Sequence, residues 1–133
     1  MAYLLDSNLV LPYLADDPAT VRLVEHLVPE GNTISVITYM EVYQGTLRGP
    51  DAVRSQDHLE HVLAVVPILP ISPAVARRCA RLREELRARN RRVRDRALDL
   101  MIAATALAHE LQLVTRNMAD YADIPGLTLF NLR

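Results

Sequence analysis

Short apolar runs alternate along the chain with longer segments in which apolar residues recur every three or four positions. The short runs have the length of buried β-strands and lie at residues 3–5, 33–37, 65–69, 111–115 and 127–130. The longer segments have the spacing of amphipathic helices and begin near residues 8, 19, 38, 51, 73 and 98. Strands that alternate with helices predict right-handed crossovers and a mostly parallel sheet. We therefore expect an α/β fold, a three-layer α/β/α sandwich that forms a single domain over residues 1–133.

Residues with special backbone preferences mark the expected helix starts. Ser7 or Asn8 is expected to cap the first helix, with Pro12 in its first turn. Ser72 and Pro73 have the types preferred at the cap and the first position of a helix, so they are expected to open the arginine-rich helix.

Glycine and proline indicate where other elements end. Gly45, Gly49 and Pro50 are expected to end the helix that begins near residue 38. Two prolines, inside and just after the run at 65–69, limit that strand to a short one or to the edge of the sheet.

Composition narrows the class of protein. Half of the residues are hydrophobic, which is enough to form a core without crosslinks. The single cysteine, Cys79, excludes an internal disulfide and a zinc site built from several thiolates. No apolar run approaches the roughly 18 residues of a membrane span, and the N-terminal residues lack the pattern of a signal peptide. We therefore expect a cytoplasmic protein with no membrane partner.

The distribution of charge is more informative than the net charge of −1. All fifteen basic residues are arginines, and ten of them lie between Arg77 and Arg96 with only three acidic residues. This stretch has a net charge of +7, so the rest of the chain carries −8. Such a basic stripe is typical of a surface that contacts a phosphate backbone, although it is also compatible with a solvated helix face.

Polar side chains follow the predicted strands at the edge where parallel α/β sheets bind their ligands. Asp6 comes directly after the first strand, and Glu41 lies one turn into the helix after the second. Asp99 lies in the first turn of the helix at 98–111, while Asn117 and Asp120 follow the strand at 111–115. Four separate segments thus deliver oxygen ligands to one edge of the sheet.

Each of these residues also has a structural explanation. Glu41 could close a capping box with Thr38, and Asp6 could cap the first helix. Asp99 could interact with the helix dipole, while Asn117 and Asp120 could form turns. These separate explanations do not account for the shared position of all five residues.

Electrostatics indicates what a cluster of carboxylates would bind. Two carboxylates about 4 Å apart repel by roughly 4 kcal/mol at an effective dielectric constant near 20. Oxygen ligands without histidine or cysteine favour Mg²⁺, with Mn²⁺ as a substitute, over zinc. The four histidines lack a third ligand near them in the sequence and are expected at the surface. A magnesium site of this kind suits phosphodiester hydrolysis.

At these residues the chain resembles the PIN-domain ribonucleases, especially the VapC-type toxins of toxin–antitoxin pairs. The resemblance covers nearly the whole chain and is carried by four motifs in order. These are Leu4-Leu5-Asp6-Ser7-Asn8, the run from Ile37 to Gly45, the run from Asp99 to Ala108, and Leu113-Val114-Thr115-Arg116-Asn117. Asp120-Tyr121 and Ile124-Pro125-Gly126-Leu127 are also similar to the family pattern.

The resemblance implies roles for the acidic residues. Asp6 and Asp99 would be the principal magnesium ligands, and Glu41 would complete the metal site directly or through water. Asp120 would complete the catalytic set, as an outer ligand or a loop anchor. The fourth site position is shared between Asn117 and Asp120, because many relatives have an acid where Asn117 stands.

The resemblance also implies how the chain would contact its substrate. Ser7, Asn8, Thr115, Arg116 and Asn117 would form the substrate-binding set. The neighbouring arginines would offset the repulsion between the carboxylates and the RNA backbone. The segment from Arg89 to Arg96 would alternatively bind an acidic antitoxin tail.

The resulting hypothesis is a magnesium-dependent endoribonuclease that is inhibited by a cognate antitoxin and, as in the family, forms a homodimer. The alternative is a catalytically inactive PIN-like module that binds RNA or serves as a scaffold. A phosphoacceptor receiver-like domain also places an acid after its first strand. That fold requires a lysine after a late strand, and this chain contains no lysine.

Overall fold

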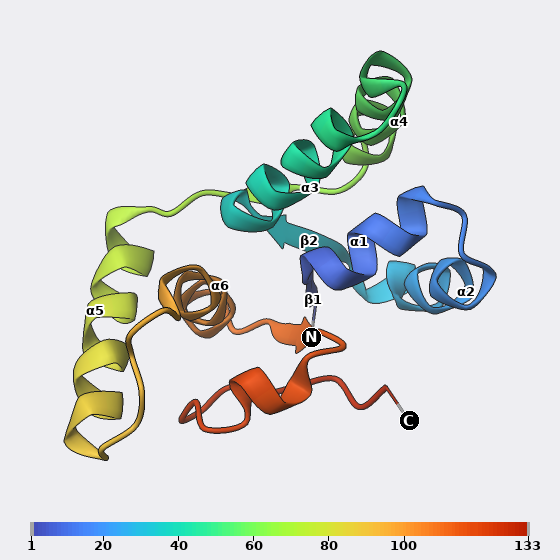
Figure 1. The fold of residues 1–133 in the computed structure, drawn as a ribbon. Coiled ribbons are helices and arrows are strands. Elements are labelled where there is room, and N and C mark those ends of the chain that lie inside the picture. The colour runs from blue at the N-terminus through green and yellow to red at the C-terminus, as the bar shows by residue number, and fades with distance from the viewer. Residues whose placement is uncertain (1, 133) are drawn as a thin grey trace.

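The computed structural model describes residues 2–132, and its elements follow the predicted alternation (Figure 1). The strands are β1 (Tyr3–Leu5), β2 (Asn32–Ser35), β3 (Ile68–Leu69) and β4 (Gln112–Val114). The α-helices are α1 (Ser7–Leu14), α2 (Pro18–Leu27), α3 (Val36–Arg48), α4 (Ala52–Leu63), α5 (Pro73–Ala88) and α6 (Ala97–Ala108). Two short 3₁₀ helices are η1 (Val28–Glu30) and η2 (Met118–Tyr121).

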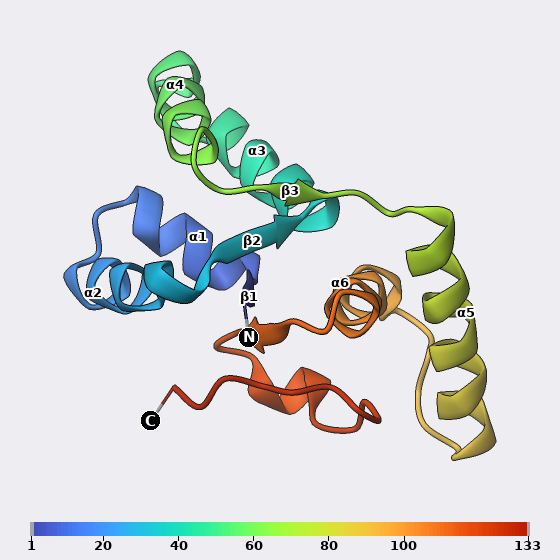
Figure 2. The ribbon, with the colours of Figure 1, turned by 180° about the vertical axis from the view of Figure 1, so that it is seen from behind.

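The strands form a sheet of order β3-β2-β1-β4, in which every described pair is parallel. From β1 the chain moves outward to β2 and β3, and it then returns to place β4 on the other side of β1. Figure 2 shows the two-residue strand β3 at the edge beside β2, as its prolines predicted. The order reverses between β1 and β4, and such a switch point leaves a crevice at the carboxyl ends of the strands.

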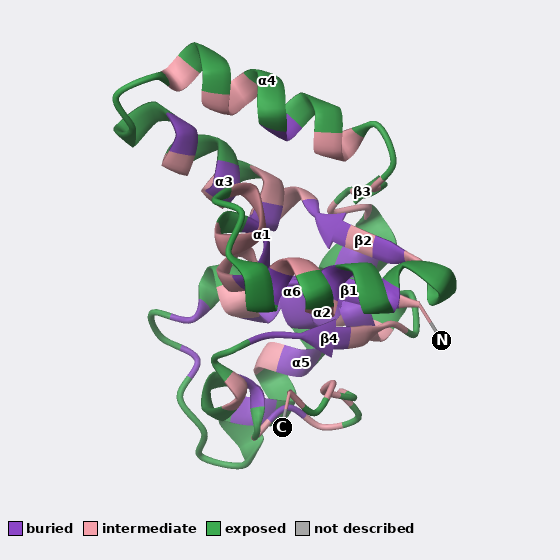
Figure 3. Ribbon diagram, turned by 90° about the vertical axis from the view of Figure 1, so that its right-hand side faces the viewer, coloured by how far each residue is buried: buried purple, intermediate pink, exposed green. Residues whose placement is uncertain are grey.

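Alternate residues of the strands enter two separate hydrophobic cores. Leu4 and Leu113 pack with side chains of α5 and α6, whereas Leu5 and Val114 pack with side chains of the first four helices. The sheet therefore separates two helical layers, which confirms the predicted three-layer α/β/α sandwich (Figure 1). Figure 3 shows that β2 and β4 are largely buried, while α4 is largely exposed.

The start of α1 differs from the prediction. Asp6, and not Ser7 or Asn8, occupies the cap position, and its carboxylate accepts a hydrogen bond from the Ser7 amide. Pro12 lies inside the helix rather than in its first turn. The alternative that Asp6 caps the helix is therefore confirmed, and this cap fixes the Asp6 carboxylate at the end of β1.

The boundary between β2 and α3 lies earlier than predicted. Ser35 caps α3, because its hydroxyl accepts a hydrogen bond from the Thr38 amide at 3.0 Å. Thr38 is therefore a buried residue inside the helix, and the capping box between Thr38 and Glu41 is wrong. Glu41 is left without a capping role. Gly45 does not end the helix, which continues to Arg48.

The predicted fifth strand at residues 127–130 is wrong. This segment touches the sheet through a single parallel bridge between Leu129 and Leu113. The amide of Phe130 donates to the Leu113 carbonyl, and the Leu113 amide donates to the Thr128 carbonyl. The run is apolar because it covers the side of β4, although it does not form a regular strand.

The remaining expectations concern single residues and membrane spans. Cys79 is buried, and burial raises the pKa of its thiol. All four histidines are exposed, as predicted. Among the helices of residues 2–132, none is long and apolar enough to cross a membrane.

Candidate functional site

Asp6 lies at the switch point of the sheet, where β1 ends beside β4. The residue is 5% exposed. Oδ1 accepts a hydrogen bond from the Ser7 amide at 2.8 Å, and Oδ2 accepts one from the Thr115 hydroxyl at 2.9 Å. Burial raises the pKa of Asp6, and the charge of Asp99 raises it further, while these hydrogen bonds lower it. The hydrogen bonds thus hold the carboxyl group in one orientation, and its surroundings favour the uncharged form.

Thr115, at the end of β4, positions Asp6 and is itself fully buried. Its hydroxyl donates to Asp6 and accepts hydrogen bonds from Asn8 Nδ2 and the Asn117 amide, both at 3.1 Å. The Asn8 side chain also accepts a hydrogen bond at Oδ1 from the Arg116 amide, at 3.1 Å. These contacts give Thr115 and Asn8 a positioning role toward Asp6, and their predicted contact with substrate stays a prediction.

Glu41 and Asp99 face the same region from two different helices. Glu41 lies on α3 and is partly buried, and Asp99 lies in the first turn of α6. Burial raises the pKa of Glu41, the charges of Asp6 and Asp99 raise it further, and a hydrogen bond with the Ser7 side chain lowers it. The three acidic residues singled out from the sequence therefore lie within range of one another's charge.

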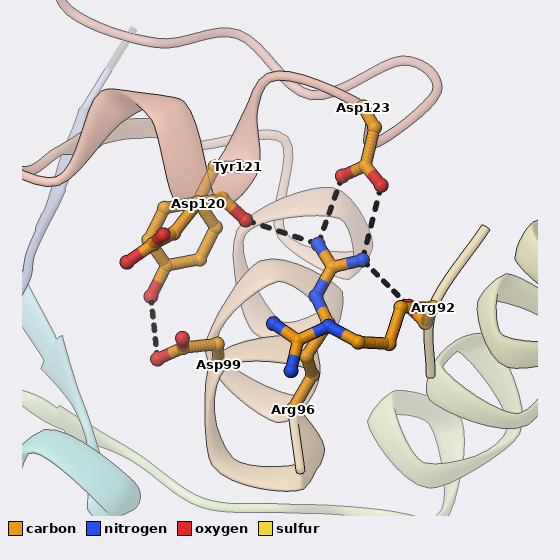
Figure 4. A network of polar contacts seen from close by, with 6 residues as sticks. All are labelled: Arg92, Arg96, Asp99, Asp120, Tyr121 and Asp123. Atoms are coloured by element: carbon orange, nitrogen blue, oxygen red, sulfur yellow. Dashed lines mark hydrogen bonds and ion pairs between the residues drawn. The ribbon is translucent and has the colours of Figure 1, made fainter. Parts of the chain in front are cut away.

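Tyr121, on η2, joins Asp6 to Asp99 and was not predicted as a site residue. Its buried hydroxyl lies 3.2 Å from Asp99 Oδ1 (Figure 4). The same hydroxyl lies 3.4 Å from Asp6 Oδ2. Burial, followed by the charges of both carboxylates, raises the pKa of Tyr121 well above its usual range. The hydroxyl therefore stays protonated and donates to the carboxylates. The sequence contains no local signal for this contact beyond the proximity of Asp120.

Arg96 anchors the segment that carries Tyr121. Its guanidinium forms two hydrogen bonds with the Asp123 carboxylate, at 2.8 and 3.0 Å, and donates to the Asp120 carbonyl at 3.0 Å (Figure 4). It also donates to the Arg92 carbonyl at 2.7 Å. The Arg96 side chain is only 9% exposed, so this arginine is part of the framework of the site.

The other predicted residues lie around the cluster and not inside it. Asn117 and Asp120 are exposed. The backbone carbonyl of Asp120 belongs to the clamp, which consists of Arg96 with its partners Asp123 and the carbonyls of Asp120 and Arg92. Arg116 is exposed, and its guanidinium donates to the Thr20 hydroxyl at 2.9 Å. Ser7 is partly buried beside Glu41.

An open cavity of about 560 Å³ connects the acidic cluster to the basic stripe. Asp99 and Asp120 form part of its wall, together with Arg91 and Arg92 from the loop after α5. Both of these arginines are exposed. The end of the stripe thus lies beside the carboxylates, where cationic groups can bind an anionic ligand.

The donor set of the cluster fits a hard divalent cation. It consists of carboxylate and hydroxyl oxygens, which Mg²⁺ and Mn²⁺ prefer. The pKa values of Asp6 and Glu41 are raised because the carboxylates are buried and lie near other negative charges. Within residues 2–132, no three acidic, histidine or cysteine side chains form a ready cage for a metal ion. The Tyr121 hydroxyl lies between two of the carboxylates instead. A cation bound here would need to retain water molecules, as Mg²⁺ commonly does.

We expect lower pH to stabilise the fold through this cluster when divalent cations are absent. The pKa values of Asp6 and Glu41 are raised in the folded state, so the folded chain holds these protons more tightly than the unfolded chain. The free energy of unfolding therefore increases as pH falls from about 8 through the folded pKa values towards the unfolded values near 4. Urea unfolding in EDTA should show a larger increase for the wild type than for Glu41→Gln.

Glu25→Gln, which changes an exposed carboxylate on α2, is the matched control for this pH experiment. It should keep the pH response of the wild type. If Glu41→Gln gained as much stability on acidification as the wild type and this control, the proximity of the carboxylates would not affect folding.

Comparison with known proteins identifies relatives that are similar in sequence and structure over nearly the whole chain. The family model described as "PIN domain" matches residues 3–126. Ribonuclease VapC2 of Rickettsia felis is 28% identical over 133 residues, which cover 98% of each chain. The tRNA(fMet)-specific endonuclease VapC of Shigella flexneri is 28% identical over 127 residues, or 96% of this chain and 95% of the relative. A crystal structure of VapBC2 from Rickettsia felis bound to a promoter DNA fragment superposes with a TM-score of 0.87 and 26% identity, covering 100% of both chains.

Proposed function

This chain belongs to the PIN domain family, and from that membership we propose that it is an endoribonuclease, the toxin of a toxin–antitoxin pair. The observation that carries the proposal is the arrangement of Asp6, Glu41 and Asp99 at the switch point of the sheet, within range of one another's charge. The names of the relatives, a ribonuclease and a tRNA endonuclease, support RNA as the substrate class.

A divalent cation, Mg²⁺ or Mn²⁺, is the proposed cofactor. Asp6 and Asp99 would hold it, with Glu41 contributing directly or through water. When bound, the cation would lower the pKa of a water molecule and offset the charge of the reacting phosphate. The positive charge of the cation would also offset the cost of burying the Asp6 and Glu41 carboxylates and the repulsion between them.

Asp6 and Glu41 suit different roles in hydrolysis. The Asp6 carboxylate is nearly fully buried and is held by the Ser7 amide and the Thr115 hydroxyl, which suits a fixed ligand. Glu41 is more exposed, so a water molecule can reach its carboxylate, and its pKa is raised, as is that of Asp6. We assign to Glu41 the orientation of the attacking water and the acceptance of its proton at a carboxylate oxygen. The water oxygen bonds to phosphorus as the bond to the leaving oxygen of the RNA chain breaks.

The arginines beside the cavity would bind the RNA backbone. Arg91 and Arg92 line the cavity that reaches Asp99, and Arg116 is exposed next to Asn117. Their charges would offset the repulsion between phosphate and carboxylate groups, so binding should weaken as salt is added. Arg96 is excluded from this role, because its guanidinium is used in the buried pair with Asp123.

The proposed partner is an antitoxin protein encoded with this chain. Several solved structures that resemble the chain are VapBC complexes, including those from Rickettsia felis and Salmonella typhimurium. An acidic antitoxin segment would match the basic loop at residues 89–96. A homodimer and a cytoplasmic location, where RNA is accessible, complete the proposal.

The test is RNA cleavage by the purified protein with the metal removed and restored. Cleavage should fall below about one-hundredth of its rate in EDTA and recover when Mg²⁺ or Mn²⁺ is added in excess. Asp99→Asn should stay inactive after the metal is restored. RNA binding that is unaffected by EDTA, without cleavage in either condition, would instead favour the inactive RNA-binding module.

A further inference from the structure

Asp6 and Asp99, the two carboxylates proposed to hold the cation, are not held in place in the same way. Asp6 accepts hydrogen bonds from the Ser7 amide at 2.8 Å and from the Thr115 hydroxyl at 2.9 Å. Asp99 Oδ1 lies 3.2 Å from the Tyr121 hydroxyl, which is the one hydrogen-bond partner of the Asp99 side chain in the described part of the chain. The orientation of Asp99 therefore depends on Tyr121, whereas two other donors fix Asp6.

The Tyr121 hydroxyl has a single proton to donate and two carboxylates within reach. Asp99 Oδ1 is the nearer acceptor, at 3.2 Å, and Asp6 Oδ2 lies at 3.4 Å (Figure 4). Asp6 Oδ2 already receives the proton of the Thr115 hydroxyl, whereas Asp99 Oδ1 has no second donor among residues 2–132. Loss of the tyrosine hydroxyl would therefore affect Asp99 more than Asp6.

Tyr121 is itself fixed relative to the helix that carries Asp99. The residue is 2% exposed and belongs to the same hydrophobic core as Leu100 of α6. The carbonyl of its neighbour Asp120 accepts a hydrogen bond at 3.0 Å from the guanidinium of Arg96, which directly precedes α6. The core and the clamp thus hold the hydroxyl beside the first turn of α6, where Asp99 lies.

The second oxygen of Asp99 is available to a ligand. Asp99 is partly buried and lines the open cavity of about 560 Å³. Its Oδ2 is accessible to solvent and has no hydrogen-bond partner among residues 2–132. A hydrogen bond to Oδ1 limits rotation of the carboxylate and leaves Oδ2 uncommitted. Carboxylates that bind metal ions are commonly oriented by hydrogen bonds of this kind.

We propose that Tyr121 is a positioning residue of the cation site, which orients Asp99 through Oδ1 so that Oδ2 is free to bind the cation. The inference rests on the proposed cofactor and extends it to a residue whose hydroxyl acts through Asp99. Without the hydroxyl, the Asp99 carboxylate rotates more freely, so cation affinity falls although both negative charges are kept. Loss of such a hydrogen-bond partner typically weakens metal binding by about 10–100-fold.

The test is Mn²⁺ binding to the full-length chain, measured by isothermal titration calorimetry for the wild type and Tyr121→Phe. The matched control is Tyr39→Phe, which also removes a tyrosine hydroxyl next to a carboxylate, in the exposed contact of 3.4 Å with Glu60 between α3 and α4. Tyr121→Phe should bind Mn²⁺ about tenfold or more weakly, and Tyr39→Phe should bind it as the wild type does. Equal or tighter binding by folded Tyr121→Phe would overturn this inference and leave the cation site intact. A wild type without a saturable site would overturn both.

A second measurement uses the wild type alone, so it decides the proposal even if Tyr121→Phe does not fold. In equal volumes of H₂O and D₂O, slow exchange of the buried hydroxyl should split the NMR signal of ¹³C-labelled Tyr121 Cζ into two lines. Both lines should remain when Mg²⁺ saturates the chain, because the hydrogen bond to Asp99 is kept. A single averaged line in the saturated chain would show that the cation displaces the hydroxyl, which contradicts the positioning role.

Discussion

Replacing Asp6 by asparagine is expected to lower the rate of RNA cleavage about a thousandfold or more. The change removes one of the two charges proposed to hold the cation. It also puts an amide N–H₂ group near the Thr115 hydroxyl, which already accepts hydrogen bonds from Asn8 and the Asn117 amide. The lost hydrogen bond lowers the free energy of unfolding by about 1–3 kcal/mol, and removal of the repulsion from Glu41 and Asp99 offsets part of this loss. Single-turnover cleavage and urea unfolding of the same preparation separate the two effects.

Thr115→Val is the matched control for the Asp6 variant. It removes the hydrogen bond to Asp6 and keeps the negative charge. Its free energy of unfolding should fall by about 1–3 kcal/mol, because the hydrogen bond is lost and the repulsion is kept, but cleavage should fall by no more than about tenfold. If Asp6→Asn cut RNA at the wild-type rate, or if Thr115→Val lost as much activity as Asp6→Asn, the role of the Asp6 charge would be wrong.

Replacing Arg96 by methionine is expected to lower the free energy of unfolding by about 3–5 kcal/mol. The change leaves the Asp123 carboxylate, 22% exposed, without its cation and leaves the carbonyls of Asp120 and Arg92 without their donor. It also frees η2, so the Tyr121 hydroxyl should lose its fixed position between Asp6 and Asp99. Urea unfolding measures the loss of stability, and the NMR signals of Tyr121 report its mobility.

Two further variants distinguish the ion pair between Arg96 and Asp123 from ordinary surface ion pairs. Arg87→Met breaks the exposed pair between Arg87 and Glu84, and exposed pairs contribute between about 0 and 1 kcal/mol. In the double variant Arg96→Met, Asp123→Leu, the unpaired charge is removed, so part of the stability should return. A loss below about 1 kcal/mol in Arg96→Met would show that the clamp does not hold this segment.

The sequence was sufficient to predict the three acidic residues, because one topological rule connects them. Parallel strands place their carboxyl ends at one edge, so acids that follow different strands become neighbours in space. Asp6 and Glu41 could be found in this way even though the boundaries of the elements around them were imprecise. Ser35 illustrates the imprecision, because a polar residue within a β-branched run gave no sign that it was a helix cap.

Contacts between distant segments could not be predicted in this way. Tyr121 lies 115 residues from Asp6, and its position depends on how η2 packs against α6. Arg96 belongs to a run of arginines, so its charge suggested a surface role, whereas the fold largely buries its side chain and pairs it with the partly exposed Asp123. The run at residues 127–130 has the composition of a strand, but a strand also needs a neighbour along its length. The structure provides only one bridge, at Leu129.

Binding of Mn²⁺ to the purified chain, measured by isothermal titration calorimetry, tests most directly whether these acidic residues form one cation site. The matched control is Asp95→Asn, which removes a negative charge from the same cavity at a left-handed position, φ 63°, that asparagine tolerates. We predict one saturable Mn²⁺ site in the wild type and in Asp95→Asn, weakened at least about thirtyfold in both Asp6→Asn and Asp99→Asn. Equal Mn²⁺ affinity in all four chains, or no saturable site in the wild type, would contradict the account.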